Sequence, residues 1–177
     1  MSTDMPAFRY HPDPLASGSI RESTETCVCC NHIKGRIYTA TFYTAQKVSG
    51  RFCPWCIADG SAAERFAGEF TDSYGLEGVS EETLHEVTRR TPGFHGWQDP
   101  HWLVHCHDAA AFISEVGYRE LAIHPAVLDQ LRHDLRMDGW RDAAKLEQFL
   151  THLGEGATAM LFRCTFCGTH LAYVDAS

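Results

Sequence analysis

The hydrophobic and polar positions of the chain predict strands near both of its ends. Residues 37–43 are mostly β-branched or aromatic, and Gly35 before them and Ser49-Gly50 after them supply turns, so this segment predicts a strand. Two further apolar runs, at 159–163 and 171–174, predict a pair of strands close to the C-terminus.

Five other segments have the spacing or the end signals of helices. They are residues 61–68, 80–91, 108–116, 125–139 and 146–154. Ser61 with Glu64 resembles a capping box, Ser80 precedes two acidic residues, and Pro125 occupies a first helical position. The last three segments repeat apolar residues at i, i+3 and i+4, and a glycine ends each of them. Strands near the ends with helices between them predict an α+β fold.

Two Cys-x-x-Cys pairs stand out in the N-terminal half. The spacing of Cys27 with Cys30 and of Cys53 with Cys56 is typical of four thiolates that share one Zn²⁺. A knuckle, a hairpin and a second pair that leads into a helix predict a treble-clef-like zinc lobe. The alternatives are a disulfide framework or a redox dithiol at 53–56. A redox motif is expected as a single pair in a βαβ setting, so zinc is favoured.

A third pair, Cys164 and Cys167, lies between the two C-terminal strands and is followed by Gly168. Strand, Cys-x-x-Cys-Gly and strand predict a zinc-knuckle β-hairpin, because glycine permits the positive φ that closes backbone N–H groups onto the sulfurs. Cys106 is the economical third thiolate of this second site. Cys29, next to Cys30, is surplus to both sites.

The fourth ligand of the second site is left open between water and four histidines. These are His101, His105, His107 and His170. We expect His107, which adjoins Cys106 at the start of the predicted helix, whereas His105 would point away from the metal on an extended segment. A closed four-ligand site is structural, while three ligands plus water is catalytic, so this ligand decides the chemistry.

The predicted sites divide the chain into three parts. Residues 1–26 form an extended N-terminal arm, residues 27–79 the treble-clef-like lobe, and residues 80–177 a helical region plus the C-terminal zinc hairpin, with the lobe and this region in one compact unit. In the aromatic segment 94–102, Trp97 and Trp102 are expected to anchor the core. The same segment is our choice for a contact or pocket surface.

Composition narrows the partners and the compartment. The chain is 44% hydrophobic and 21% charged, as in globular proteins, and its formal net charge is −8. This negative charge disfavours nucleic acid as a partner. The apolar runs are too short to cross a bilayer, and the first residues lack a secretory signal. We therefore expect a cytoplasmic protein without membrane insertion, in which eight cysteines favour metal over disulfides.

Four motifs in order resemble a known family. They are FRYHPDP at 8–14, CPWCIADGSAA at 53–63, RTPGFHGWQDPHWLVHC at 90–106 and FRCTFCGTHLAYVD at 162–175. Together they resemble the CbrC family, a bacterial family whose label refers to colicin tolerance. The resemblance covers nearly the whole chain except 118–155. It implies a small cytoplasmic bacterial protein with no established enzymatic activity.

The resemblance also implies two cysteine sets. Cys27, Cys30, Cys53 and Cys56 match the first set, and Cys106, Cys164 and Cys167 match the second. Relatives place a further cysteine at the position of Ala110, so the resemblance makes His107 or His170 the replacement ligand.

These observations predict a small protein with two structural Zn²⁺ ions that acts as a protein-interaction or regulatory module, with an unidentified protein partner. The alternative is a zinc-dependent enzyme with an open position on the second metal near Cys106. Its proton carrier would be Asp99, Asp108 or a histidine of segment 95–107. The sequence contains no H-E-x-x-H, G-x-S-x-G or phosphate-binding glycine loop, which favours the first function.

Overall fold

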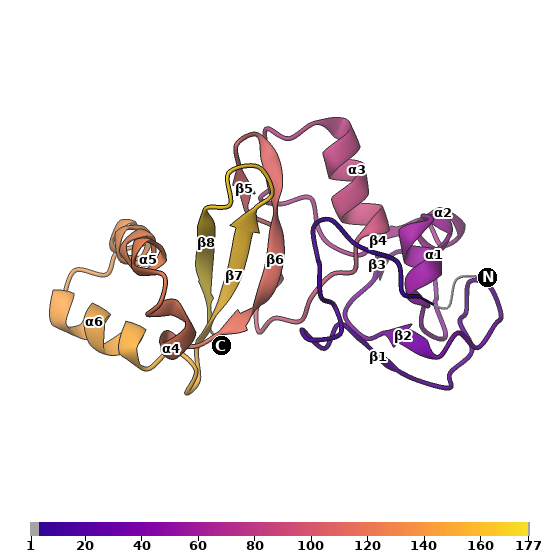
Figure 1. Ribbon diagram of the computed structural model, residues 1–177, viewed down its shortest axis with the longest axis horizontal. Helices are drawn as coiled ribbons and strands as arrows, with labels where there is room; N and C mark the ends of the chain where they lie inside the picture. Colours follow the sequence, from indigo (N-terminus) through magenta and orange to yellow (C-terminus); the bar gives the residue numbers. More distant parts are fainter. Residues whose placement is uncertain (1–3, 177) are drawn as a thin grey trace.

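The protein is described by a computed structural model over residues 4–176, and it forms three blocks along its long axis (Figure 1). An N-terminal lobe lies at one end, a four-stranded sheet in the middle and a group of helices at the other end. The lobe contains β1 (Ile20–Glu22), β2 (Arg36–Tyr38), β3 (Tyr43–Thr44), α1 (Pro54–Ala58), α2 (Ser61–Arg65) and β4 (Gly68–Glu69). Helix α3 (Glu81–Arg90) lies between the lobe and the sheet.

The central sheet is antiparallel throughout, in the order β5-β6-β7-β8. Its strands are β5 (Val104–His105), β6 (Asp108–Val116), β7 (Thr158–Cys164) and β8 (His170–Asp175). The two predicted C-terminal strands are confirmed as β7 and β8. Mixed helix and sheet confirm the α+β fold, although the end-to-end order of the blocks is visible only in the structure.

Three helices pack against one face of the sheet, on the side away from the lobe (Figure 1). They are α4 (Tyr118–Leu121), α5 (Pro125–Met137) and α6 (Ala143–Thr151). Helix α5 begins at Pro125, as predicted. The capping box expected of Ser61 with Glu64 is not formed, because Gly60 is the N-cap of α2 and the Ser61 hydroxyl donates to the Asp59 carboxylate at 2.6 Å instead. The predicted cap of α3 is also confirmed, because the Ser80 hydroxyl accepts a hydrogen bond from the Thr83 N–H at 3.1 Å.

The helix predicted over 108–116 is wrong, because this segment is strand β6. Its apolar residues are buried on both faces of the sheet, and a continuous apolar strand has no alternation to distinguish it from a helix. A β-bulge in this strand also makes its apolar pattern resemble that of a helix. The pairing with β7 shifts between Phe112 and Ser114, so that Phe112 and Val116 lie on opposite faces. This shift gives a strand the apolar spacing of a helix.

The strand predicted over 37–43 is interrupted, and its two ends pair with different partners. β2 pairs with β1 of the predicted arm, and β3 pairs with β4. The Tyr38 hydroxyl donates to the Thr41 carbonyl at 2.7 Å and stabilises the intervening bend. Within residues 4–176, the expected hairpin between the first two cysteine pairs is therefore not formed. The arm also packs closely, since Phe8, Tyr10 and His11 are buried.

Buried side chains form one cluster per block. The first surrounds the cysteines of the lobe, the second joins α4–α6 to one face of the sheet, and the third is an aromatic cluster on the other face. Trp102 belongs to the aromatic cluster and donates its indole N–H to the Ala110 carbonyl at 2.7 Å, so its anchoring role is confirmed. Trp97 is 67% exposed, so its predicted core position is wrong. No helix within residues 4–176 has the length and apolar character needed to cross a membrane.

Candidate metal centres

The first candidate centre brings together the two N-terminal cysteine pairs. The Sγ atoms of Cys27, Cys30, Cys53 and Cys56 all lie within 4.8 Å of one another. The Cys27–Cys56 separation is 3.9 Å and the Cys30–Cys53 separation is 4.0 Å. Because Zn–S bonds are about 2.3 Å long, sulfurs at tetrahedral corners lie about 3.8 Å apart. The four sulfurs therefore already have the spacing of a tetrahedral metal site.

Backbone geometry places each of these pairs. Residues 27–30 form a turn in which the Asn31 N–H donates to the Cys27 carbonyl at 2.8 Å, and Asn31 has a positive φ of 57°. Cys53 immediately precedes α1, and its N–H donates to the Cys27 sulfur at 3.2 Å. A parallel bridge between Cys27 and Arg51 holds the two segments together. The second pair thus lies at the start of α1, where free N–H groups stabilise thiolates.

The sulfurs of this centre compete for negative charge when no cation is bound. Contacts with the Cys53 and Cys56 side chains hold the pKa of Cys27 far below its usual range. The contact with Cys27 raises the pKa of Cys53 to about 12, and contacts with Cys27 and Cys53 raise the pKa of Cys56 still more strongly. A divalent cation would remove this competition, because it stabilises every thiolate at once.

The second candidate centre contains His105, Cys106, Cys164 and Cys167, whose ligand atoms also lie within 4.8 Å of one another. His105 Nδ1 is 3.2 Å from the Cys106 sulfur and 3.4 Å from the Cys167 sulfur. In a tetrahedral zinc site, a ligating nitrogen and sulfur lie about 3.5 Å apart. Cys164 is buried while Cys106 and Cys167 are exposed, so this centre lies at the surface of the sheet.

A tight turn explains why His105 rather than His107 joins this group. The register Val104↔Ala109 and His105↔Asp108 leaves Cys106-His107 as a two-residue hairpin loop. Both loop residues have positive φ, 53° and 59°, as a type I′ turn requires. The chain reverses directly after His105, so His105 and Cys106 are not consecutive residues of one extended strand. Within the described residues, the group of ligand atoms therefore includes His105 in place of the expected His107.

The third cysteine pair forms the other half of the second centre. The Cys164 sulfur accepts hydrogen bonds from the N–H groups of Phe166 and Cys167, both at 3.4 Å. Gly168 has a φ of 75°, and its N–H donates to the Cys164 carbonyl at 3.1 Å. The Cys164 N–H donates to the Thr169 carbonyl at 2.8 Å and closes the loop. Gly168 thus has the conformation that the sequence predicted.

Asp108 joins the two hairpins of the second centre to the arm. Its carboxylate accepts hydrogen bonds from Thr165 at 2.8 Å, Tyr10 at 2.8 Å and Thr83 at 3.1 Å, and it forms an ion pair with Arg9 at 2.7 Å. Burial alone would raise the pKa of Asp108, but the hydrogen bonds from Thr165, Tyr10 and Thr83 hold it below its usual range. A carboxylate held ionised by four donors is poorly suited to carry protons.

The remaining candidate ligands lie outside both groups. His101 stacks on Tyr173 with ring centroids 3.9 Å apart, and His170 packs against His124 at 4.2 Å. Cys29 is buried, and its thiol lies 3.6 Å from the Ser61 hydroxyl. Cys29 belongs to neither group of ligand atoms, as the sequence predicted. All eight cysteines of the chain are free of disulfide bonds.

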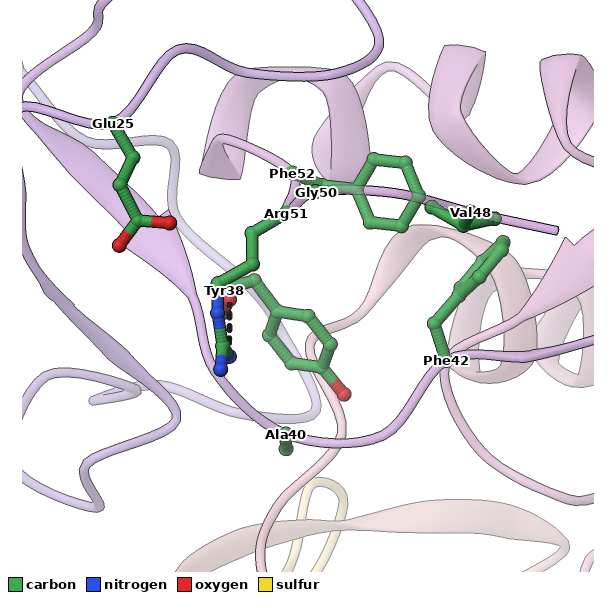
Figure 2. Close-up of a pocket in the computed structure, with 8 residues that line it drawn as sticks. All are labelled: Glu25, Tyr38, Ala40, Phe42, Val48, Gly50, Arg51 and Phe52. Carbon is green, nitrogen blue, oxygen red and sulfur yellow. Dashed lines mark hydrogen bonds between the residues drawn. The ribbon is translucent and has the colours of Figure 1, made fainter.

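A hollow of about 420 Å³ lies beside the first centre (Figure 2). Phe42, Val48 and Phe52 gather on one side of it, and Glu25 lies on the other. The Arg51 guanidinium donates to the Thr39 carbonyl at 3.0 Å and is thereby tied to the backbone. The Phe42 ring packs against Phe52, the residue next to Cys53, with ring centroids 4.7 Å apart, and this contact helps to fix the second cysteine pair.

Both centres lie within a segment that matches a protein family. The model of an "Uncharacterised protein family (UPF0167)" matches residues 5–176. The chain belongs to the UPF0167 family. UPF0167 proteins of Mycobacterium bovis and Mycobacterium tuberculosis are each 47% identical to it over 175 residues, which cover 97% of this chain and 93% of theirs. A UPF0167 protein of Pseudomonas aeruginosa is 48% identical over 124 residues, 68% of this chain and 69% of its own.

No solved structure matches this UPF0167 protein. The two groups of sulfur and nitrogen atoms are the features of this UPF0167 protein that bear most directly on its function.

Proposed function

We propose that this protein binds two structural Zn²⁺ ions and acts as a protein-interaction or regulatory module. One observation carries the proposal: two separate groups each place four cysteine or histidine ligand atoms within 4.8 Å. Sulfur and imidazole donors at tetrahedral spacing suit Zn²⁺ better than the oxygen-preferring Mg²⁺ or Ca²⁺. Cys27, Cys30, Cys53 and Cys56 would hold one ion, and His105, Cys106, Cys164 and Cys167 the other.

Four protein donors at each centre support a structural rather than a catalytic role. A catalytic zinc keeps one position for water, whereas a structural zinc has four protein ligands. In this proposal His105 would be the fourth donor of the second centre, so the enzyme alternative would need one of these ligands to leave. Asp108, a predicted proton carrier of that alternative, already accepts hydrogen bonds from Tyr10, Thr83 and Thr165.

We also infer zinc-site types for the two centres. A Cys-x-x-Cys turn combined with a pair at the start of α1 supports a treble clef, in which pairing of β2 with β1 and of β3 with β4 takes the place of the usual hairpin. The loop between β7 and β8 supports a zinc knuckle. Cytoplasmic location, the CbrC label and a role in colicin tolerance stay predictions.

Chelation tests whether the metals are structural. Because ligand sites of this kind bring together segments far apart in the chain, loss of the metal is expected to unfold them. Purified protein treated with a strong chelator at neutral pH should lose near-UV circular dichroism and melt at a lower temperature, and added Zn²⁺ should restore both. A chelated chain that keeps its spectrum and its Tm would contradict the structural role.

A further inference from the structure

We propose that a pocket between the N-terminal lobe and the sheet binds the guanidinium group of an arginine side chain from a partner protein. The pocket has a volume of about 510 Å³. Tyr43 of β3, the segment after β4 and the segment before β5 form its walls. The inference rests on the proposed role as a protein-interaction module, and it names the chemistry that this module recognises.

The pocket combines aromatic faces with negative charge. Tyr43, Tyr74 and His101 provide the aromatic walls, and Asp72 and Asp99 provide the carboxylates. Within residues 4–176, neither carboxylate forms an ion pair with a basic side chain. Both lie close enough to the Tyr43 phenol to raise its pKa, in addition to the larger effect of burial. Aromatic faces and unpaired carboxylates together attract an organic cation.

The His101 side chain contributes an aromatic ring to the pocket and does not offset the negative charge of the two aspartates. Its ring stacks on Tyr173 and meets the Tyr74 ring edge-on at 5.8 Å. Burial lowers the pKa of His101 and so favours the neutral imidazole. Asp72 Oδ1 accepts from the Tyr74 N–H at 2.7 Å, which leaves its second oxygen for a ligand.

Backbone contacts hold the pocket walls in place before any ligand arrives. The buried Asp175 carboxylate accepts hydrogen bonds from the N–H groups of Trp97 at 2.6 Å and Gln98 at 3.0 Å. Gly75, at a φ of 87°, lies so near the Trp102 carbonyl that a Cβ would be only 2.5 Å from its oxygen. A preorganised pocket loses less entropy on binding than a mobile loop.

Two features favour arginine on a protein over other cations. The planar guanidinium stacks on aromatic rings and donates to two carboxylates at once, whereas an ammonium is a compact point charge. Tyr74, which lines the pocket, is 69% exposed, and exposed tyrosine is typical of protein interfaces. The chain's charge of −8 also attracts a basic partner.

The test is an NMR titration of the zinc-loaded protein with three probes. They are N-acetyl-arginine methylamide, its neutral isostere N-acetyl-citrulline methylamide, and a short peptide with one arginine flanked by glycine and serine. We expect saturable shifts of aromatic resonances with a dissociation constant of about 1 mM for the arginine amide, tighter binding of the peptide and no binding of citrulline. Equal binding of citrulline, or no saturable shift, would overturn the proposal. So would a peptide that gains nothing over the amide, because the site would then suit a free small cation.

Matched variants locate the binding. Asp99→Asn should weaken the arginine probe about fivefold, and Tyr74→Ala by a similar factor, because each removes one exposed contact to the cation. Asp138→Asn, an exposed aspartate after α5, is the control and should leave binding unchanged. An Asp99→Asn variant that binds like the control would also overturn the proposal. Zinc content of each sample, measured in parallel, separates failure of this pocket from failure of the metal centres.

Discussion

The Asp108 carboxylate accepts a hydrogen bond from the Thr165 hydroxyl at 2.8 Å, and this contact joins the two hairpins that hold the second metal centre. Asp108 follows the turn that contains Cys106, and Thr165 lies between Cys164 and Cys167. The hydrogen bond therefore fixes one ligand hairpin relative to the other. Groups that orient metal ligands in this way influence metal affinity without touching the metal.

Substitution of Asp108 should weaken the second centre. Asp108→Asn loses the ion pair with Arg9 and one of the acceptors that Thr165 and Tyr10 use. We expect zinc affinity at one of the two sites to fall about tenfold, measured by competition with a chromogenic chelator. Glu115→Gln, an exposed change on the same strand, is the control. Equal affinities in the two variants would show that the hairpins need no such link.

Substitution of two neighbouring histidines, one at a time, can identify the fourth ligand of the second centre. His105→Ala should lower the zinc content from about two ions per chain to about one, because three thiolates remain at an exposed site. His107→Ala should keep both ions, since His107 lies in the turn and outside the ligand group. Metal analysis after gel filtration measures both. The reverse outcome, with His107→Ala losing an ion, would restore the ligand expected from the sequence.

Buried His11 should make the fold sensitive to mild acid. The Pro92 carbonyl can only accept, so His11 Nδ1 carries the proton at 2.8 Å from it, and Nε2 accepts from the Ser17 hydroxyl at 2.7 Å. Burial lowers the pKa of His11 from 6.5 to about 4. Between these pH values the unfolded chain takes up a proton that the folded chain does not. The free energy of unfolding should therefore fall by up to about 3 kcal/mol as the pH drops from 6.5 to 4.

The measurement for His11 is a set of urea unfolding curves between pH 7 and pH 4. His11→Asn retains an amide donor for Pro92 but does not titrate, so its stability should fall less steeply over this range. Protonation of the zinc ligands affects both proteins alike, and the difference between their slopes reports His11. Parallel slopes would mean that His11 is protonated equally in the folded and unfolded chains.

Gly93 should tolerate no side chain. A Cβ there would lie 2.2 Å from the Phe70 carbonyl oxygen and 2.8 Å from the Tyr38 hydroxyl. Because the nearest atom belongs to the backbone, Gly93→Ala should destabilise the fold by about 1–3 kcal/mol. Gly156→Ala meets no heavy atom within 4 Å and should change stability by less than about 0.5 kcal/mol. Thermal melts of the two variants check this difference.

The parts of the structure that local signals determine were predictable from the sequence. Cys-x-x-Cys spacing, the Ser80 cap, Pro125 at a helix start and Gly168 after the last pair each act over a few residues, and each has the expected place in the structure. The spacing also identifies the three cysteine pairs, whereas Cys106 is assigned to the second set as the economical third thiolate and by the family resemblance.

The errors arose where long-range pairing determines the conformation. Strand β6 was predicted as a helix because its bulge and its burial on both faces remove the alternation that would mark a strand. His105 ranks below His107 as a candidate ligand on the expectation of an extended segment, because a type I′ turn without glycine at Cys106-His107 gives no recognisable signal. The adjacent His-Cys-His run was the available hint that one of the two histidines meets the metal.

The most direct test is zinc-edge X-ray absorption combined with metal counting on the purified protein. We predict about two zinc ions per chain, with sulfur as the dominant neighbour at about 2.3 Å and a minor nitrogen contribution at about 2.0 Å. Seven sulfurs and one nitrogen shared between the two ions would match the two groups. A metal-free protein with disulfides between these cysteines, or zinc surrounded mainly by oxygen, would contradict the account.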